Sequence, residues 1–229
     1  MKDGTPFVWN NQSNPYDNRD PRMKYTIVCN EMKWPVDPVE IWEGGTNGLP
    51  LQNATTTGYY LKKYVNNTIS FEAGSTVTKK QHNWVLFRYG EILLNYAEAM
   101  INAFHDPNYK DAVYNMSARE AVNQIRGRTN ISLPGFPSDI TEKDFVKRLK
   151  NERRVELAFE GHRFWDVRRW KELGQTANIY GVKITKNNEV ISYEKFLLET
   201  RAVTDNMYFY PIPNTERFKN PNLGQNPGW

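Results

Sequence analysis

Hydrophobic residues follow a helical repeat most clearly in the middle of the chain. Between Trp84 and Phe104, apolar residues recur at spacings of three and four positions. This pattern predicts a helix that is buried over most of its circumference. The polar residues of the segment form one narrow stripe, made of Arg88, Glu91, Asn95, Glu98 and Asn102.

Capping boxes predict two further helices, over about 118–128 and 142–160. In each, a hydroxyl residue precedes an acid by three positions: Ser117 with Glu120, and Thr141 with Asp144. Gly161 suits a helix stop or a sharp bend, and 164–173 has the pattern of a fourth helix. We therefore expect residues 84–173 to form a helical core of two antiparallel helix pairs, as in a bundle or a helical repeat.

Residues 1–83 lack a helical period and are interrupted by turn dipeptides that contain Pro, Gly and Asn. Two short stretches, 25–29 and 59–65, are rich in β-branched and aromatic residues and are predicted as strands. The segment is therefore expected to be a long, ordered, loop-rich region, which is typically functional when it lies inside a compact protein.

The C-terminal segment, 174–229, is expected to cover the helices. Its first part predicts a hairpin over 182–192 around Asn187 and Asn188, which tolerate positive φ. The tail from Tyr210 onward is rich in proline and is predicted to be extended. The three segments together are interpreted as one domain.

Composition limits the function further. No stretch approaches the ~18 consecutive apolar residues of a membrane-spanning helix. Residues 1–20 contain no basic and apolar run of a secretory signal. The net charge is +4, but acids and bases alternate along 147–156, a pattern that disfavours nucleic acid as a partner. A single cysteine, Cys29, excludes an internal disulfide.

The densest polar cluster lies between residues 152 and 166. Three of its acids stand one helical turn apart. A basic residue lies three or four positions from each of them: Arg148 before Glu152, Arg153 before Glu156, and Arg163 after Glu160. The cluster is therefore predicted to be structural, with salt bridges among Glu152, Arg153, Glu156, Glu160, Arg163 and Asp166.

An alternative interpretation of the same cluster is a hydrolase or metal site. It would use carboxylates for acid–base chemistry together with one imidazole: Glu156, Glu160, His162 and Asp166. Catalytic zinc usually takes more nitrogen or sulfur ligands than this cluster offers. Neither a metal ion nor another cofactor is predicted, and the protein is not expected to be an enzyme.

Aromatic residues in the first segment are the candidate ligand-binding groups: Trp9, Tyr16, Trp34 and Trp42. Sugars present apolar C–H faces ringed by hydroxyls, so a sugar site needs flat rings with planar hydrogen-bonding groups nearby. Such groups surround the first two rings, namely Asn10, Asn11, Asn14, Asp17 and Asn18. Contact with a protein partner and simple packing of the loops remain open alternatives for each ring.

Several segments together resemble the SusD/RagB family. The helix WVLFRYGEILLNYAEA, from Trp84, resembles the family's RYAEVLLNYAEA helix. The stretch from Glu152 to Trp170 is similar to ERR.EL.FEG.R..DLRRW, and NQIRGR from Asn123 is similar to N.VR.R. The ending from Pro211 resembles PIP..E...NP.L.QNPG. Upstream, NRDPR from Asn18 and TGYYLKKY from Thr57 also fit.

The resemblance implies a mainly α fold with tetratricopeptide-like helix pairs, a long loop-rich N-terminal segment and an extended C-terminal tail. It implies a non-catalytic component of an outer-membrane uptake complex that binds glycans or other nutrients for a SusC-like TonB-dependent transporter. It also implies a surface-exposed lipoprotein, anchored through an N-terminal cysteine, in Bacteroidetes-type bacteria. Family members are longer, so this chain is expected to be the C-terminal part of one. Within the complex, a scaffold that binds protein alone is the alternative.

Overall fold

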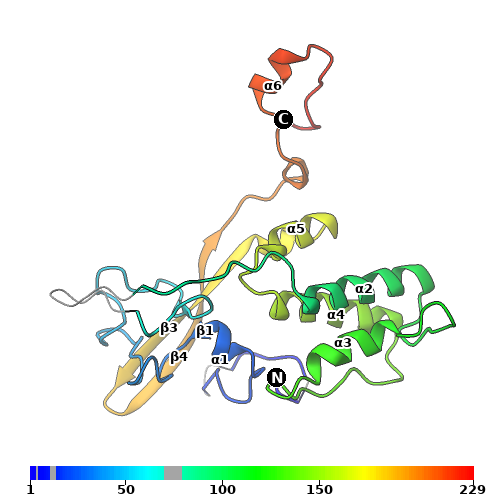
Figure 1. The fold of residues 1–229 in the computed structure, drawn as a ribbon. Coiled ribbons are helices and arrows are strands. Elements are labelled where there is room, and N and C mark those ends of the chain that lie inside the picture. The colour runs from blue at the N-terminus through cyan, green and yellow to red at the C-terminus, as the bar shows by residue number, and fades with distance from the viewer. Residues whose placement is uncertain (4, 11–13, 70–78) are drawn as a thin grey trace.

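The computed structural model describes residues 1–3, 5–10, 14–69 and 79–229. It consists of a helical region, a region built from loops and a long hairpin, and a projecting tail (Figure 1). In chain order the elements are α1 (Met23–Thr26), β1 (Ile27–Val28), β2 (Tyr60–Leu61), α2 (Tyr89–Phe104), α3 (Ala118–Arg126), α4 (Glu142–Glu156), α5 (His162–Arg169), the 3-10 helix η1 (Leu173–Thr176), β3 (Asn178–Asn187), β4 (Val190–Thr200), the 3-10 helix η2 (Asp205–Tyr208) and α6 (Asn214–Lys219).

Helices α2, α3 and α4 pack around the main hydrophobic core. Its fully buried side chains include Leu94 and Ile101 from α2, Val122 and Ile125 from α3, and Phe145 from α4. Burying a side chain of this size stabilises the fold by roughly 1.5–3 kcal/mol. The structure is therefore helix-rich as predicted, and the core of α2, α3 and α4 supports the polar cluster.

Helix α2 is shorter and less buried than its apolar pattern predicted. It begins at Tyr89, because the backbone at Arg88 is extended, with φ −146° and ψ 156°. Its buried face carries Leu93, Ala97 and Met100, whereas Tyr89 is 68% exposed. The described neighbours of α2 cover one side of the helix only, so the prediction of burial around most of its circumference was wrong.

Local sequence signals mark the starts of α3 and α4. Ser117 and Glu120 form the predicted capping box, and the Thr141 hydroxyl accepts from the Asp144 N–H. Helix α4 ends at Glu156, about a turn before the predicted end. Past that point the backbone reverses through positive φ at Phe159 (64°) and at Gly161 (83°), so α5 begins already at His162.

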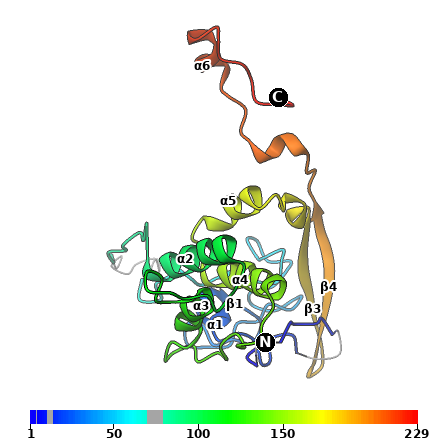
Figure 2. The same ribbon diagram turned by 90° about the vertical axis from the view of Figure 1, so that its right-hand side faces the viewer.

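Strands β3 and β4 form an antiparallel hairpin that is longer than predicted and runs beside the helices (Figure 2). Asn187 pairs with Val190, so the turn consists of Asn188 and Glu189, with φ +54° at Asn188. The hairpin and the loops around the β1–β2 pair enclose a second, smaller core of Val28, Val39, Ile41, Val182, Ile184 and Tyr193.

The tail leaves β4 and extends away from both cores (Figures 1 and 2). The part from Tyr210 onward is not extended throughout as predicted, because it contains the short helix α6, and η2 lies just before it. Glu216 in the first turn of α6 and Lys219 in its last turn complement the helix dipole. Within the described ranges, no helix has the length and apolar character that crossing a membrane requires.

Candidate functional site

The acids of the predicted cluster lie in a buried network at the C-terminal end of α4. Glu152 and Glu156 are 2% and 5% exposed. Arg22, from the loop-rich segment, donates from Nη1 to Glu152 Oε1 at 2.5 Å and to Glu156 Oε2 at 2.9 Å. Arg126 from α3 donates to Glu152 Oε2 at 2.7 Å, and Arg128 donates to Glu156 Oε2 at 2.8 Å. The end of α4 is therefore joined to the loop-rich segment and to the end of α3.

Arg88 connects the same network to the start of α2. Its guanidinium donates to Glu156 Oε1 at 2.7 Å, and to both carboxylate oxygens of Glu160 at 2.6 and 2.8 Å. Lys63 from the loop-rich segment donates to Glu160 Oε1 at 2.6 Å. The contacts therefore bind the loop-rich segment and α2 to the same helix.

Side chains from outside α4 also satisfy carbonyls at its C-terminal end. Arg88 Nη2 donates to the Glu156 carbonyl at 2.6 Å, and Lys63 Nζ donates to the Ala158 carbonyl at 2.8 Å. The last carbonyls of a helix lack intrahelical donors, and the helix dipole makes this end negative. Because these two cations satisfy carbonyls at the end of the helix, the chain can leave the helix before Glu160.

A second network holds α2, α4 and α5 together around Asp166, which is 3% exposed. Arg153 donates from Nε to Asp166 Oδ2 at 2.8 Å and from Nη1 to Asn95 Oδ1 at 2.6 Å. Arg169 also pairs with Asp166, and it contacts Glu98 on α2. Each acid of the predicted cluster thus has at least one basic partner.

The partners differ from those that local spacing predicted. Glu152, Glu156 and Glu160 pair with residues far away in the sequence. Arg148 instead lies with its guanidinium 5.9 Å from the centre of the Phe136 ring. Arg163 lies apart from both networks and donates to Gln175 Oε1 at 3.0 Å. Long side chains from other segments reach these carboxylates across the packed interface.

The network favours the charged form of Glu156 and Glu160. Burial alone would raise the pKa of Glu156, but hydrogen bonds from Arg88, Arg22 and Arg128 outweigh it and lower the pKa to about 2. For Glu160 burial acts in the same way, and Arg88 and Lys63 lower its pKa overall. A general acid that works near neutral pH needs a raised pKa. The geometry therefore suits ion pairs that join segments of the chain rather than proton transfer.

Metal ligation has little support among the same residues. Within the described ranges, no three His, Cys, Asp or Glu side chains are grouped so that they could hold a metal ion. His162, the one imidazole of the predicted cluster, has its Nε2 atom 3.6 Å from Glu91 Oε2 on α2. His162 therefore faces an acid of α2.

The four predicted ligand-binding aromatics gather around the second core. Trp9, Tyr16, Trp34 and Trp42 are each half-buried against it. Tyr16 packs edge-on against Tyr59 and Tyr193, with ring centres 6.1 and 5.3 Å apart. Asn10, Asn14, Asp17 and Asn18 are exposed near the first two rings, and Asn11 lies outside the described residues.

Trp34 and Trp42 each have a lysine over one ring face. Lys62 Nζ lies 4.4 Å from the centre of the Trp34 ring, and Lys186 Nζ lies 4.5 Å from that of Trp42. The sequence analysis predicted neither of these lysine–indole contacts. A flexible lysine over an indole leaves this face accessible to a ligand that displaces the side chain.

Arg22, Lys63 and Arg88 are among the cluster residues that spacing around 152–166 missed. Each lies in or beside a segment that resembles the SusD/RagB pattern: NRDPR, TGYYLKKY and the α2 helix. That resemblance is the one sequence signal that could have marked them, since pairing rules reach only three or four positions along a helix.

Comparisons with known proteins agree with this architecture. SusD-like protein P2 of Formosa agariphila is 29% identical over 163 residues, which cover 69% of this chain and 28% of that protein. SusD-like protein P38 of the same organism is 37% identical over 150 residues, 63% of this chain and 24% of that protein. This chain thus spans about a quarter of the length of these relatives.

Solved structures share the fold. A SusD-like protein from Bacteroides fragilis superposes with a TM-score of 0.80 at 27% identity, over 100% of this chain and 45% of that one. A SusD superfamily protein from Bacteroides vulgatus superposes with a TM-score of 0.54 at 22% identity, over 93% of this chain and 40% of that one. A family model described as "SusD family" matches residues 1–229. With its whole length matched in this way, the chain belongs to the SusD family.

Proposed function

We propose that the protein containing this chain is a non-catalytic, glycan- or nutrient-binding component of an outer-membrane uptake complex. Its partner would be a SusC-like TonB-dependent transporter, and it would be held at the cell surface by an N-terminal lipid anchor. The observation that carries the proposal is family membership across residues 1–229. The paired acids at the end of α4 agree with a structural rather than a catalytic role.

The fold-level part of the proposal concerns the helices. We infer that the α2–α3 and α4–α5 pairs belong to a tetratricopeptide-like array. The short connection 157–161 between α4 and α5 and the packing of α2 on both α3 and α4 support this inference. In this arrangement the array is the support, and the loop-rich segment attached to it by ion pairs carries the ligand.

The ligand would bind along the loop-rich segment. Trp34 and Trp42 are the strongest candidates, because the second core fixes each ring while a mobile lysine lies over one face. A sugar ring would replace the lysine and stack its C–H face on the indole. Trp9 would extend the same surface. Tyr16 is enclosed by two other tyrosines and would mainly hold its loop in position.

Affinity electrophoresis of the intact protein through gels that contain individual polysaccharides tests this proposal. At least one glycan should retard the protein, and Trp34→Ala with Trp42→Ala should abolish the retardation. Trp229→Ala is the matched control, because this indole lies in the tail and is 49% exposed. Absence of binding to any glycan, peptide or other nutrient would refute the proposal.

A scaffold that binds protein alone is the second candidate, and one observation favours it. The segment before α2 exposes a run of apolar side chains, with Leu86 73% and Phe87 77% exposed. Exposed apolar runs of this kind are typical of protein interaction sites. Capture of a transporter by a protein that has no affinity for any nutrient would favour this alternative.

A further inference from the structure

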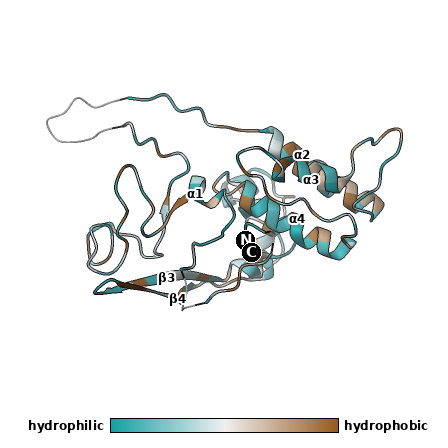
Figure 3. Cartoon of the chain, turned by 90° about the horizontal axis from the view of Figure 1, so that it is seen from below, coloured by the Kyte–Doolittle hydropathy of each residue, from teal (hydrophilic) through white to brown (hydrophobic). Residues whose placement is uncertain are grey.

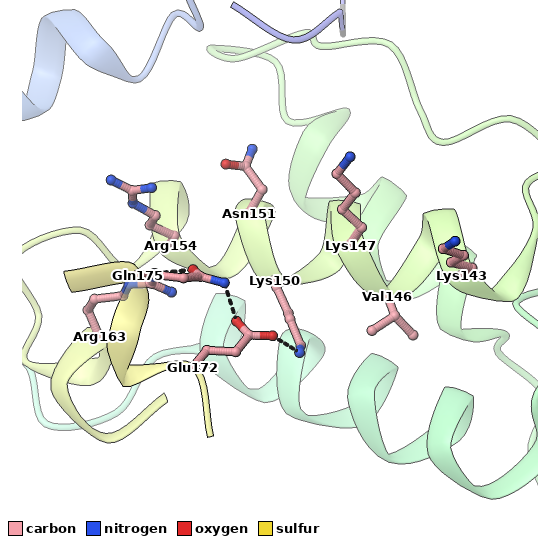
Figure 4. Close-up of a pocket in the computed structure, with 9 residues that line it drawn as sticks. All are labelled: Lys143, Val146, Lys147, Lys150, Asn151, Arg154, Arg163, Glu172 and Gln175. Atoms are coloured by element: carbon pink, nitrogen blue, oxygen red, sulfur yellow. Dashed lines mark hydrogen bonds and ion pairs between the residues drawn. The ribbon is translucent and has the colours of Figure 1, made fainter. Parts of the chain in front are cut away.

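A basic pocket lies along α4, and none of the aromatic residues of the loop-rich segment lines it (Figure 4). Its volume is about 310 Å³, and α4, the beginning of α5 and the η1 region line it. Five of its nine lining side chains are cationic, and a single one is acidic, Glu172. The cations are Lys143, Lys147, Lys150, Arg154 and Arg163.

Helical spacing produces this concentration of charge. Lys143, Lys147, Lys150 and Arg154 follow each other at intervals of four, three and four positions, so they share one side of α4. Two acids of the same helix, Glu152 and Glu156, are buried on the other side, and the remaining two, Glu142 and Asp144, lie in its first turn. Hydrophilic residues predominate along α4 (Figure 3). Acids and bases that alternate in the sequence are thus separated in space.

The one acid of the pocket already has partners. Glu172 pairs with Lys150 and accepts from Gln175 Nε2 at 2.9 Å, while Gln175 Oε1 accepts from Arg163 at 3.0 Å (Figure 4). This chain of contacts holds Arg163 in place. Among the described residues, Lys143, Lys147 and Arg154 have no acidic partner within ion-pair distance. The pocket therefore combines a fixed guanidinium with several cations available to a ligand.

The cations also repel one another. Burial lowers the pKa of Arg163, and the nearby Arg154 charge lowers it further. Both guanidinium groups nevertheless remain charged at any physiological pH. An anion placed between them would remove the repulsion and gain charge-assisted hydrogen bonds.

We propose that this pocket is a second subsite, which binds the sulfate or carboxylate group of an anionic saccharide. Arg154 and Arg163 would hold two oxygens of the oxyanion, and Lys147 would add a point charge. The amides of Asn151 and Gln175 would reach sugar hydroxyls. A cavity of this size is at the lower end for small-ligand sites and suits about one sugar ring. The inference rests on the proposed function and adds the charge class of the ligand.

Calorimetric titration of the intact protein tests the subsite. The ligands are a dextran sulfate oligosaccharide, an oligogalacturonate and an uncharged dextran oligosaccharide of matched length. The first two separate sulfate from carboxylate as the bound group. Lys147→Gln with Arg154→Gln removes two pocket charges that have no internal partner. Lys79→Gln with Lys80→Gln removes the same charge from an exposed place outside the pocket.

At least one anionic ligand should bind, and the pocket variant should weaken its binding by about tenfold while the control changes it by less than about twofold. Equal losses in the two variants would show general attraction to a basic protein and overturn the proposal. Binding of an uncharged glycan without any anionic one would overturn it too, while leaving the proposed function intact. A single-stranded oligonucleotide that binds through these side chains when neither anionic saccharide does would also refute it.

Discussion

Arg22 needs compensation for its charge inside the fold, because it carries a full positive charge and is only 6% exposed. Burial lowers its pKa, but hydrogen bonds and charges from Asp20 and Glu152 outweigh burial and raise the pKa overall. A buried ion is tolerated only when it is paired and hydrogen-bonded. Arg22 meets this condition with three carboxylates, those of Asp20, Glu152 and Glu156. Removing any one of these carboxylates leaves part of the positive charge of Arg22 uncompensated inside the protein.

Low pH should destabilise the folded protein by protonating the same carboxylates. Glu156 titrates near 4.5 in an unfolded chain and at about 2 in the folded protein. Its contribution to the free energy of unfolding is complete above pH 4.5 and is lost as the pH falls toward 2. The urea midpoint of the intact protein should therefore fall over this range. The fall should be shallower in Glu156→Gln, and a wild-type midpoint that stays constant down to pH 2.5 would contradict the account.

Individual residues also show what a single sequence reveals. The row of Glu152, Glu156 and Glu160 and the need for basic partners follow from helical spacing. The identity of those partners does not, because Arg22 lies 130 positions from Glu152. Local rules favoured Arg148, which has no acid within ion-pair distance among the described residues and lies beside Phe136 instead. Only tertiary packing decides between two such candidates.

At the scale of elements, caps were more predictable than helix ends. The start of α3 depends on Ser117, which is 1% exposed and accepts from the Glu120 N–H at 3.2 Å. The end of α4 depends on Arg88 and Lys63, which arrive from other segments. A cap is a local signal, whereas this helix end is set by distant side chains. The same reason explains why the predicted end was a turn too late.

Loss of the α3 cap should be measurable. Ser117→Ala removes one hydrogen bond to an otherwise unsatisfied N–H and should cost about 1 kcal/mol. If the unit that unfolds has about 150–250 residues, the thermal midpoint should drop by about 3 °C. Ser192→Ala, at an exposed position of β4, serves as the control and should leave the midpoint unchanged. Equal midpoints for the two variants would count against the cap.

The hairpin turn offers a second test at this scale. Asn188 has φ +54°, a conformation that β-branched residues adopt only at a cost. Asn188→Val should therefore lower the free energy of unfolding by about 1–2 kcal/mol, while Asn188→Gly keeps it. Glu189→Val is the control beside it in the same turn. Similar urea midpoints for the two valine variants would show that the turn has another conformation.

At the scale of the molecule, two cores are joined by charged contacts. The helical core and the smaller core of the hairpin and loops use different hydrophobic residues. Arg22 and Lys63 fix the loop-rich segment to α4 between them. The resemblance to SusD/RagB proteins predicted the family and the helix-rich fold. It did not reveal the basic pocket, because only the folded helix separates its acids from its bases.

The acids at the end of α4 hold the fold together through their ion pairs with Arg22, Lys63 and Arg88. Urea unfolding of Glu156→Gln in the intact protein tests this claim most directly, with Glu142→Gln, on the exposed start of the same helix, as the control. The account predicts a loss of about 3 kcal/mol for Glu156→Gln and almost none for Glu142→Gln. A Glu156→Gln protein as stable as wild type would contradict it.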